Sequence, residues 1–284
     1  MPLNFKPPRL AIAMAATLAS ATMAQGPSQA APAAAPQPLW ELCAFALGVT
    51  QPAYPGSSQE VRTGLVLPYF IYRGPLLRAD RGTFGLRALK TPSTEVDIGF
   101  AAAFGSRANE SSARRGMPAV GTLVEFGPRL RVDLGAAPAG GRWRLAIPLR
   151  GVFDLSDGFA SRGLSFEPEI GWSTRPAGAW GAGVSLSALI GSAKLADTFY
   201  GVAPQFATAQ RPAYSARAGL IAWRLDATLT HRLDRDWRVF GFVRADSVSG
   251  AANRNSPLVE RQSGASAGLG VSWTFARSSR LTTD

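Results

Sequence analysis

Residues 221–233 read IAWRLDATLTHRL, and their side chains alternate between two kinds. Apart from His231, the odd positions from Ile221 to Leu233 are apolar, whereas the even positions include Arg224 and Asp226. A period of two places successive side chains on opposite faces of a β-strand. Strands in soluble proteins usually have about 5 to 6 residues, whereas a tilted strand that crosses a membrane needs about 9 to 11. We therefore expect a membrane-crossing strand with its apolar face towards lipid.

The same alternation recurs on both sides of this stretch. It is found in residues 96–104, 122–134, 143–155, 164–172, 180–190 and 265–275. Turn sequences separate these segments, and no segment has a convincing helical period. The sequence predicts an all-β fold, a transmembrane antiparallel up-and-down β-barrel. Roughly 235 residues at about 20 per strand and connection suggest about 12 strands, with 10 as the alternative.

The rival interpretation is a soluble sandwich or lipocalin-type barrel, which also alternates but has its apolar face inward. Tryptophans near strand ends favour the membrane, where interfacial aromatic belts form; the sequence places Trp143, Trp180, Trp237 and Trp273 there. The polar faces mix arginine with aspartate and glutamate, which can pair inside a barrel. Glu167 and Glu169 are expected to pair with arginines of the same interior, namely Arg129, Arg131, Arg144 and Arg150.

Composition excludes several classes of protein. Only 17% of the 284 residues are charged, the mean hydropathy is +0.03, and there are one Cys and one His. These values argue against a disordered chain, a disulfide and a Cys/His zinc site, while an all-oxygen Ca²⁺ or Mg²⁺ site stays open. We expect no cofactor and no metal. The net charge of +11 is almost entirely arginine and is not clustered with aromatics, so outer-membrane lipid and lipopolysaccharide are expected partners and nucleic acid is not.

The N-terminus has the layout of a secretory signal peptide. Lys6 and Arg9 precede an uncharged apolar run that ends at Ala24. We expect a signal peptide over 1–24, a disordered Ala/Pro linker over 25–39, the barrel over 40–275 and a C-terminal tail over 276–284. The protein is therefore expected to be exported.

Catalytic chemistry has little support in the sequence. A serine hydrolase needs a base, and the one histidine, His231, falls on the apolar face near a turn. Glu167 and Glu169 could resemble a glycosidase pair, but salt bridges explain them better. We expect no enzyme and no catalytic residue.

Several short motifs, in order along the chain, resemble the MipA/OmpV family, the MltA-interacting proteins. They are Tyr54-Pro55-Gly56-Ser57; Pro68, Tyr69 and Tyr72; Tyr200-Gly201-Val202; and Ser256-Pro257-Leu258. The last strand ends at Phe275, a candidate assembly signal, although nine residues follow it.

The resemblance implies an outer-membrane barrel and, for one branch, a scaffold that links murein-remodelling enzymes, a lytic transglycosylase and a penicillin-binding protein. It makes the motif positions candidate interaction sites. A narrow solute channel and a surface adhesin are the alternative functions.

Overall fold

The computed structural model describes residues 36–73, 77–80, 83–86, 89–91, 93–103, 113–174 and 178–282. All of them belong to one compact unit, Pro36–Asp284. The expected signal peptide and most of the expected linker lie outside the described residues. Among the described residues, no helix is long and apolar enough to cross a membrane.

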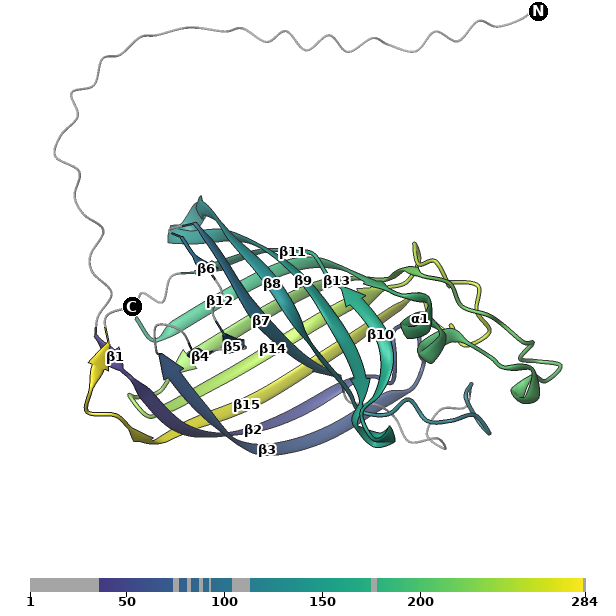
Figure 1. Ribbon diagram of the computed structural model, residues 1–284, viewed down its shortest axis with the longest axis horizontal. Helices are drawn as coiled ribbons and strands as arrows, with labels where there is room; N and C mark the ends of the chain where they lie inside the picture. The colour runs from purple at the N-terminus through teal and green to yellow at the C-terminus, as the bar shows by residue number, and fades with distance from the viewer. Residues whose placement is uncertain are drawn as a thin grey trace, which may run out of the picture. The chain divides into compact units, whose positions relative to one another are not determined.

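Long antiparallel strands form one sheet (Figure 1). They are β2 (Trp40–Pro52), β3 (Glu60–Arg73), β7 (Thr94–Ala103), β8 (Leu123–Ala136), β9 (Gly141–Asp154), β12 (Trp180–Gly191), β13 (Gly219–Arg232), β14 (Trp237–Ser247) and β15 (Ser263–Arg277). The shorter members are β4 (Leu77–Asp80), β5 (Thr83–Leu86), β6 (Leu89–Lys90), β10 (Ala160–Phe166) and β11 (Glu169–Thr174).

The sheet closes on itself because β15 pairs with β2 and β12 pairs with β13. β10 and β11 both lie between β9 and β12, so they share one position in the wall. Among the described residues, the wall has twelve positions when the short β4 and β5 are counted and ten without them. Neighbours in the wall are mostly neighbours in sequence, which confirms the up-and-down barrel.

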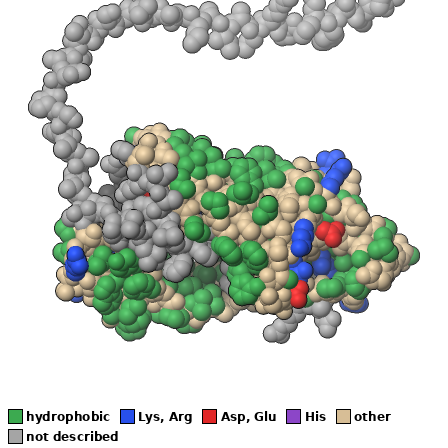
Figure 2. Space-filling model, in the orientation of Figure 1, with side chains coloured by type: hydrophobic (Ala, Val, Ile, Leu, Met, Phe, Trp, Pro, Cys, Tyr) green, Lys and Arg blue, Asp and Glu red, His purple; other side chains and the backbone are tan. Residues whose placement is uncertain are grey.

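The two faces are those that the alternation predicts. On β13, Leu225 and Leu229 are about half exposed on the outside, at 52% and 50%. Arg224 pairs inside with Glu167 at 2.7 Å, and Asp226 pairs with Arg244 at 2.7 Å. Figure 2 shows apolar side chains along the visible wall, with charged side chains gathered towards its two ends.

One end of the barrel carries an aromatic belt, the set of outward tryptophans Trp40, Trp143, Trp172, Trp180, Trp237 and Trp273. Trp237 stacks on Trp273 with ring centroids 5.6 Å apart, and Trp180 lies 4.1 Å from the His231 ring. Trp143 and Trp172 are register partners on neighbouring strands. The belt marks a membrane interface, because amphipathic rings concentrate at the headgroup level.

The first and last described residues of the chain meet beside this belt, and we call this the terminal end. β1 (Gln37–Pro38) pairs with β16 (Leu281–Thr282), and the Leu39 amide donates to the Arg280 carbonyl at 2.8 Å. Short connections join the strands here, including the 3₁₀ turn Pro138–Gly140 and residues 233–236. Phe275 is the extra residue of a bulge in β15 and packs outward, 5.6 Å from the Trp273 ring.

The opposite end carries the long connections and a helix that the periodicity did not predict. Helix α1 (Ala193–Tyr200) lies between β12 and β13 in the sequence. Its N-cap, Ser192, accepts a hydrogen bond from the Leu195 amide, and Leu195, Phe199 and Tyr200 are buried. Eight residues give barely two helical turns, which is too short for a periodic signal to stand out. Two further 3₁₀ turns, Leu155–Asp157 and Pro204–Phe206, lie at this end.

Candidate functional site: the loop cap

The long connections pack together into what we call the loop cap, residues 53–59, 113–122, 192–218 and 248–262. The cap has its own hydrophobic core, which includes Tyr54, Leu195, Tyr200, Val202 and Leu258, each at most 2% exposed. Loops at a barrel mouth usually lie open to solvent, so a buried core here indicates an ordered lid.

Two buried tyrosines join three of the cap segments. The Tyr54 hydroxyl donates to the Leu258 carbonyl, and the Tyr200 hydroxyl donates to the Pro55 carbonyl, both at 2.9 Å. Their rings pack edge to face with centroids 6.3 Å apart. Burial raises the pKa of Tyr200 above the usual value, so the hydroxyl stays a donor.

Ser256 and Gly56 complete the junction. The Ser256 hydroxyl donates to the Tyr200 carbonyl at 2.8 Å and accepts from the Leu258 amide at 3.2 Å. Gly56 has φ +89°, and its carbonyl accepts from the amides of Glu260 and Arg261. A side chain at Gly56 would be strained by that backbone conformation and would lie 3.2 Å from the Val259 methyl.

Gly201 and Val202 follow helix α1 directly. A Cβ at Gly201 would lie 2.2 Å from an Asp197 carboxylate oxygen, so only glycine fits. The Val202 amide and carbonyl exchange hydrogen bonds with Tyr214, which folds the long connection back on itself. Asn253, 1% exposed, then ties this segment to the next, since it accepts from the Arg217 amide and donates to the Arg217 carbonyl.

Arg114 holds the fourth segment in place. Its guanidinium donates to the Phe199 carbonyl at 3.0 Å and the Pro118 carbonyl at 3.2 Å, and it lies 5.8 Å from the centre of the Tyr54 ring. Arg114 is only 6% exposed, and desolvation lowers its pKa. The burial of Arg114 was not predictable from the sequence, because only the folded cap supplies the surrounding carbonyls.

The barrel interior below the cap is crossed by a chain of ion pairs. Arg150 bridges Glu125 at 3.4 Å and Glu167 at 3.3 Å, and Arg224 bridges Glu167 at 2.7 Å and Asp246 at 3.2 Å. A cavity of about 90 Å³ separates this chain from Tyr54 and Phe199 of the cap. The chain stiffens the wall and narrows the interior under the lid.

The expected partners of Glu167 were partly wrong. Arg150 does pair with it, but Arg129 and Arg131 pair with Asp97 instead, at 2.9 and 3.4 Å. The strongest partner, Arg224, was missed. Alternation identifies the face of each side chain but not which strands adjoin, and β7, with Asp97, lies next to β8.

Of the motif positions, those in 54–57, 200–202 and 256–258 meet in the cap. Pro68, Tyr69 and Tyr72 do not, since they lie on β3 in the wall. Tyr69 faces inward opposite Cys43, and Tyr72 stacks 6.1 Å from Phe70 near the aromatic belt. In the part of the chain that the structure describes, no cluster of His, Cys, Asp or Glu could hold a metal.

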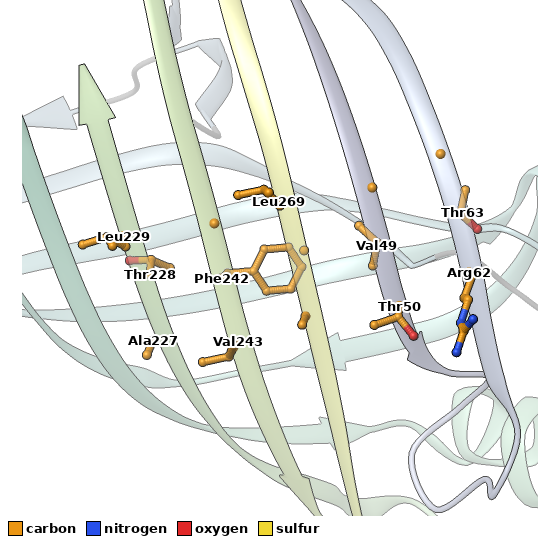
Figure 3. A pocket seen from close by; sticks show the side chains of 15 residues that line it. Val49, Thr50, Arg62, Thr63, Ala227, Thr228, Leu229, Phe242, Val243 and Leu269 are labelled. Atoms are coloured by element: carbon orange, nitrogen blue, oxygen red, sulfur yellow. The ribbon is translucent and has the colours of Figure 1, made fainter. Parts of the chain in front are cut away.

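The wall also has a hollow of about 850 Å³ at mid-height on β2, β3, β13, β14 and β15 (Figure 3). Four of its lining residues, Gly48, Gly64, Gly241 and Gly268, lack a side chain, which makes the wall thin there. Phe242 lies in the middle of this region, between Thr228 and Val49.

The closed antiparallel wall, its lipid-facing surface and its aromatic belt define an outer-membrane β-barrel protein. Residues 45–275 match the family model described as MltA-interacting protein MipA. The chain belongs to this family.

Several solved outer-membrane proteins are similar to the chain. Outer membrane phospholipase A from Escherichia coli is 10% identical, with 81% of this chain and 92% of that chain covered and a TM-score of 0.35. An outer-membrane channel from Pseudomonas putida F1 is 10% identical, with 87% and 100% covered and a TM-score of 0.41. The toluene transporter TodX of Pseudomonas putida is 7% identical, with 83% and 88% covered and a TM-score of 0.29. No curated protein sequence matches the chain.

Proposed function

We propose that this protein is a non-enzymatic scaffold of the outer membrane that links murein-remodelling enzymes, a lytic transglycosylase and a penicillin-binding protein. The family name, MltA-interacting protein, supports a murein enzyme as partner. The barrel anchors the protein in the membrane, and ordered surfaces at its ends are available to other proteins.

The lengths of the connections indicate which end meets the murein. Outer-membrane barrels have short periplasmic turns and longer extracellular loops. The short turns lie at the terminal end and the long connections form the loop cap, so the terminal end faces the periplasm. Murein enzymes work in the periplasm and therefore bind at the terminal end, not at the cap where most motif residues meet.

The observation that carries the proposal is that hydrogen bonds and an ion pair fix the turn at the surface of the terminal end. The Asp234 carboxylate accepts from the amides of Asp236 and Trp237, both at 2.7 Å, and these hydrogen bonds lower the pKa of Asp234. Arg277 pairs with Asp236. Arg235 and Arg280 are exposed at this end beside the ordered turn, and these two cations are available to carboxylates of a partner.

The geometry of the polar groups supports a non-enzymatic role. His231 lies on the outside of the wall against Trp180, where no serine is hydrogen-bonded to it among the described residues. Glu167 is bound by two arginines in the interior. Neither group is arranged for proton transfer to a substrate.

The cap surface fits the second partner class, lipopolysaccharide. Exposed cations lie on it at Arg115, Lys194, Arg217, Arg254 and Arg261. Phosphate groups of the outer leaflet are the anions nearest to an extracellular cap, and arginine binds phosphate in a bidentate manner.

The test is binding of purified transglycosylase MltA to the protein in lipid nanodiscs. We expect the double variant Arg235→Glu/Arg280→Glu to weaken binding at least tenfold. Arg115→Glu/Arg254→Glu on the cap, a matched double charge reversal of exposed arginines, should leave it unchanged. Loss of binding through the cap variant alone, or no binding by the folded wild-type protein, would contradict the proposal.

The channel alternative is tested separately in planar bilayers. The ion-pair chain and the cap predict that correctly folded protein is silent. Reproducible single-channel steps would show that the protein conducts and would favour a solute channel over the scaffold.

A further inference from the structure

Part of the barrel interior is apolar, unlike the charged interior of β8, β9, β13 and the Glu167 segment. The registers of β14, β15, β2 and β3 align inward residues in successive rows. The rows are Phe242–Gly268–Val49–Thr63, Phe240–Gly270–Leu47–Leu65 and Arg238–Ser272–Phe45–Leu67. We call these residues, Arg238 and Ser272 apart, the apolar arc.

Two phenylalanine rings cover the inner face of this part of the wall. A Cβ on Gly268 would lie 2.4 Å from the Phe242 ring, and one on Gly270 would lie 2.5 Å from the Phe240 ring. Each ring therefore lies flat over a glycine of β15. Leu67, which faces the interior, is 44% exposed, so apolar surface is presented to the interior space and not packed against another part of the described chain.

A pair of arginines adjoins the arc towards the terminal end. Arg238 and Arg232 are register partners on β14 and β13, and both face inward. Arg232 donates to the Gly178 carbonyl at 3.3 Å, and neither arginine has an ion pair with a carboxylate among the described residues. Tyr69 contacts Ser272 and Cys43 and lies near the Arg238 charge. Two cations and two hydroxyl groups thus surround one end of the arc.

We propose that the arc and the arginine pair form a binding site for a single-chain amphiphile with an anionic head. The carboxylate or phosphate head binds Arg238 and Arg232, because two adjacent guanidiniums attract an anion and no carboxylate of the described residues pairs with them. The alkyl chain lies along Phe240 and Phe242, where it covers apolar surface. From the Arg238 row to the Phe242 row is four residues, or about 14 Å at ~3.4 Å per residue.

The position of the site defines the direction of entry. The loop cap and the ion-pair chain lie beyond the far end of the arc, and the arginines lie at the terminal end. An amphiphile from the periplasmic side therefore enters tail first and keeps its head at the arginine pair. The hollow lined by Phe242, Gly268 and Val49 adjoins the same row (Figure 3).

Native mass spectrometry of the folded protein with laurate and dodecyl phosphate tests the proposal, with dodecyltrimethylammonium as the cationic counterpart. We expect one saturable adduct with either anion and at least tenfold weaker binding of the cation. Binding of laurate alone would assign the site to fatty acids, and binding of dodecyl phosphate alone to phosphate heads.

Variants separate head from tail. Arg238→Gln/Arg232→Gln should weaken the binding of laurate and dodecyl phosphate at least tenfold, and Leu47→Asp should do the same through the arc. Arg144→Gln, an inward arginine on β9 outside the arc, is the matched control and should bind as the wild type does. The mobility difference between boiled and unboiled samples on SDS gels verifies that each variant is folded. No saturable adduct, equal binding of the cation, or unchanged binding by both the arginine and the Leu47 variants would overturn the proposal.

Discussion

The variant Leu225→Arg tests two assignments that the structure makes on β13. They are that Leu225 faces the lipid and that it lies near the middle of the membrane. Leu225 is 52% exposed on the outside, between its register partners Leu186 and Ala245. His231 lies at the level of the aromatic belt. Leu225 is six residues from His231, a distance of about 20 Å along the strand at ~3.4 Å per residue. With a tilt of about 40°, the site is roughly 16 Å above the belt.

That depth is near the middle of an apolar band about 25 Å tall, where an outward arginine costs about 2 to 4 kcal/mol. Leu229 is only two residues from His231, or about 5 Å above the belt, so Leu229→Arg should cost about 0 to 1 kcal/mol. Thr228→Arg faces the interior, and its effect should also be smaller than that of Leu225→Arg.

The assay is reversible unfolding from lipid vesicles in guanidinium chloride, followed by tryptophan fluorescence and by gel mobility. The free energy of unfolding should fall most for Leu225→Arg, with unchanged slopes in denaturant. If Leu225→Arg and Thr228→Arg have equal costs, the faces are assigned wrongly. If Leu225→Arg and Leu229→Arg have equal costs, the belt is not the membrane interface.

Three further predictions concern the cap and the interior. Tyr200→Phe leaves the half-buried Pro55 carbonyl without its donor and should destabilise the cap by about 1 to 2 kcal/mol, seen as faster proteolysis within 192–218 while the wall stays resistant. Because burial raises the pKa of Tyr200, its contribution to stability is fully present below the unfolded pKa near 10 and is lost as the pH rises further; Tyr200→Phe should therefore remove a late-ionising component from the tyrosinate absorbance titration. Glu167→Gln leaves Arg150 and Arg224 short of a carboxylate and should cost on the order of 3 kcal/mol in unfolding, and an unchanged stability would show that the ion-pair chain is solvated.

The wall was largely predictable from local pattern. The alternation in residues 221–233 depends only on the two-residue period of a strand and on the chemistry of the two faces, so it predicts β13 and its outward Leu225 without any tertiary information. The tryptophans near strand ends were predictable for the same reason, because a strand that crosses the membrane reaches the interface at each end.

The cap was predictable only in part. The motif residues Tyr54, Tyr200 and Ser256 were identified by a resemblance, but nothing in their sequence spacing shows that they contact one another. Arg114 and helix α1 were missed. Arg114 and Tyr200 of the helix both contact segments that lie more than 80 residues away in sequence, through the hydrogen bonds from Arg114 to Phe199 and from Tyr200 to Pro55.

The sequence by itself therefore determined the class of fold, the lipid-facing side of each strand and the alternation of charge inside, because these follow from side-chain period and solvent. Only the tertiary structure decided which charges pair, that the long connections close into a cap, and that an apolar arc and two arginines share one side of the interior. Those features depend on strand order and register. The two-residue period cannot determine them, because every register that keeps the same side chains on the same face has the same period.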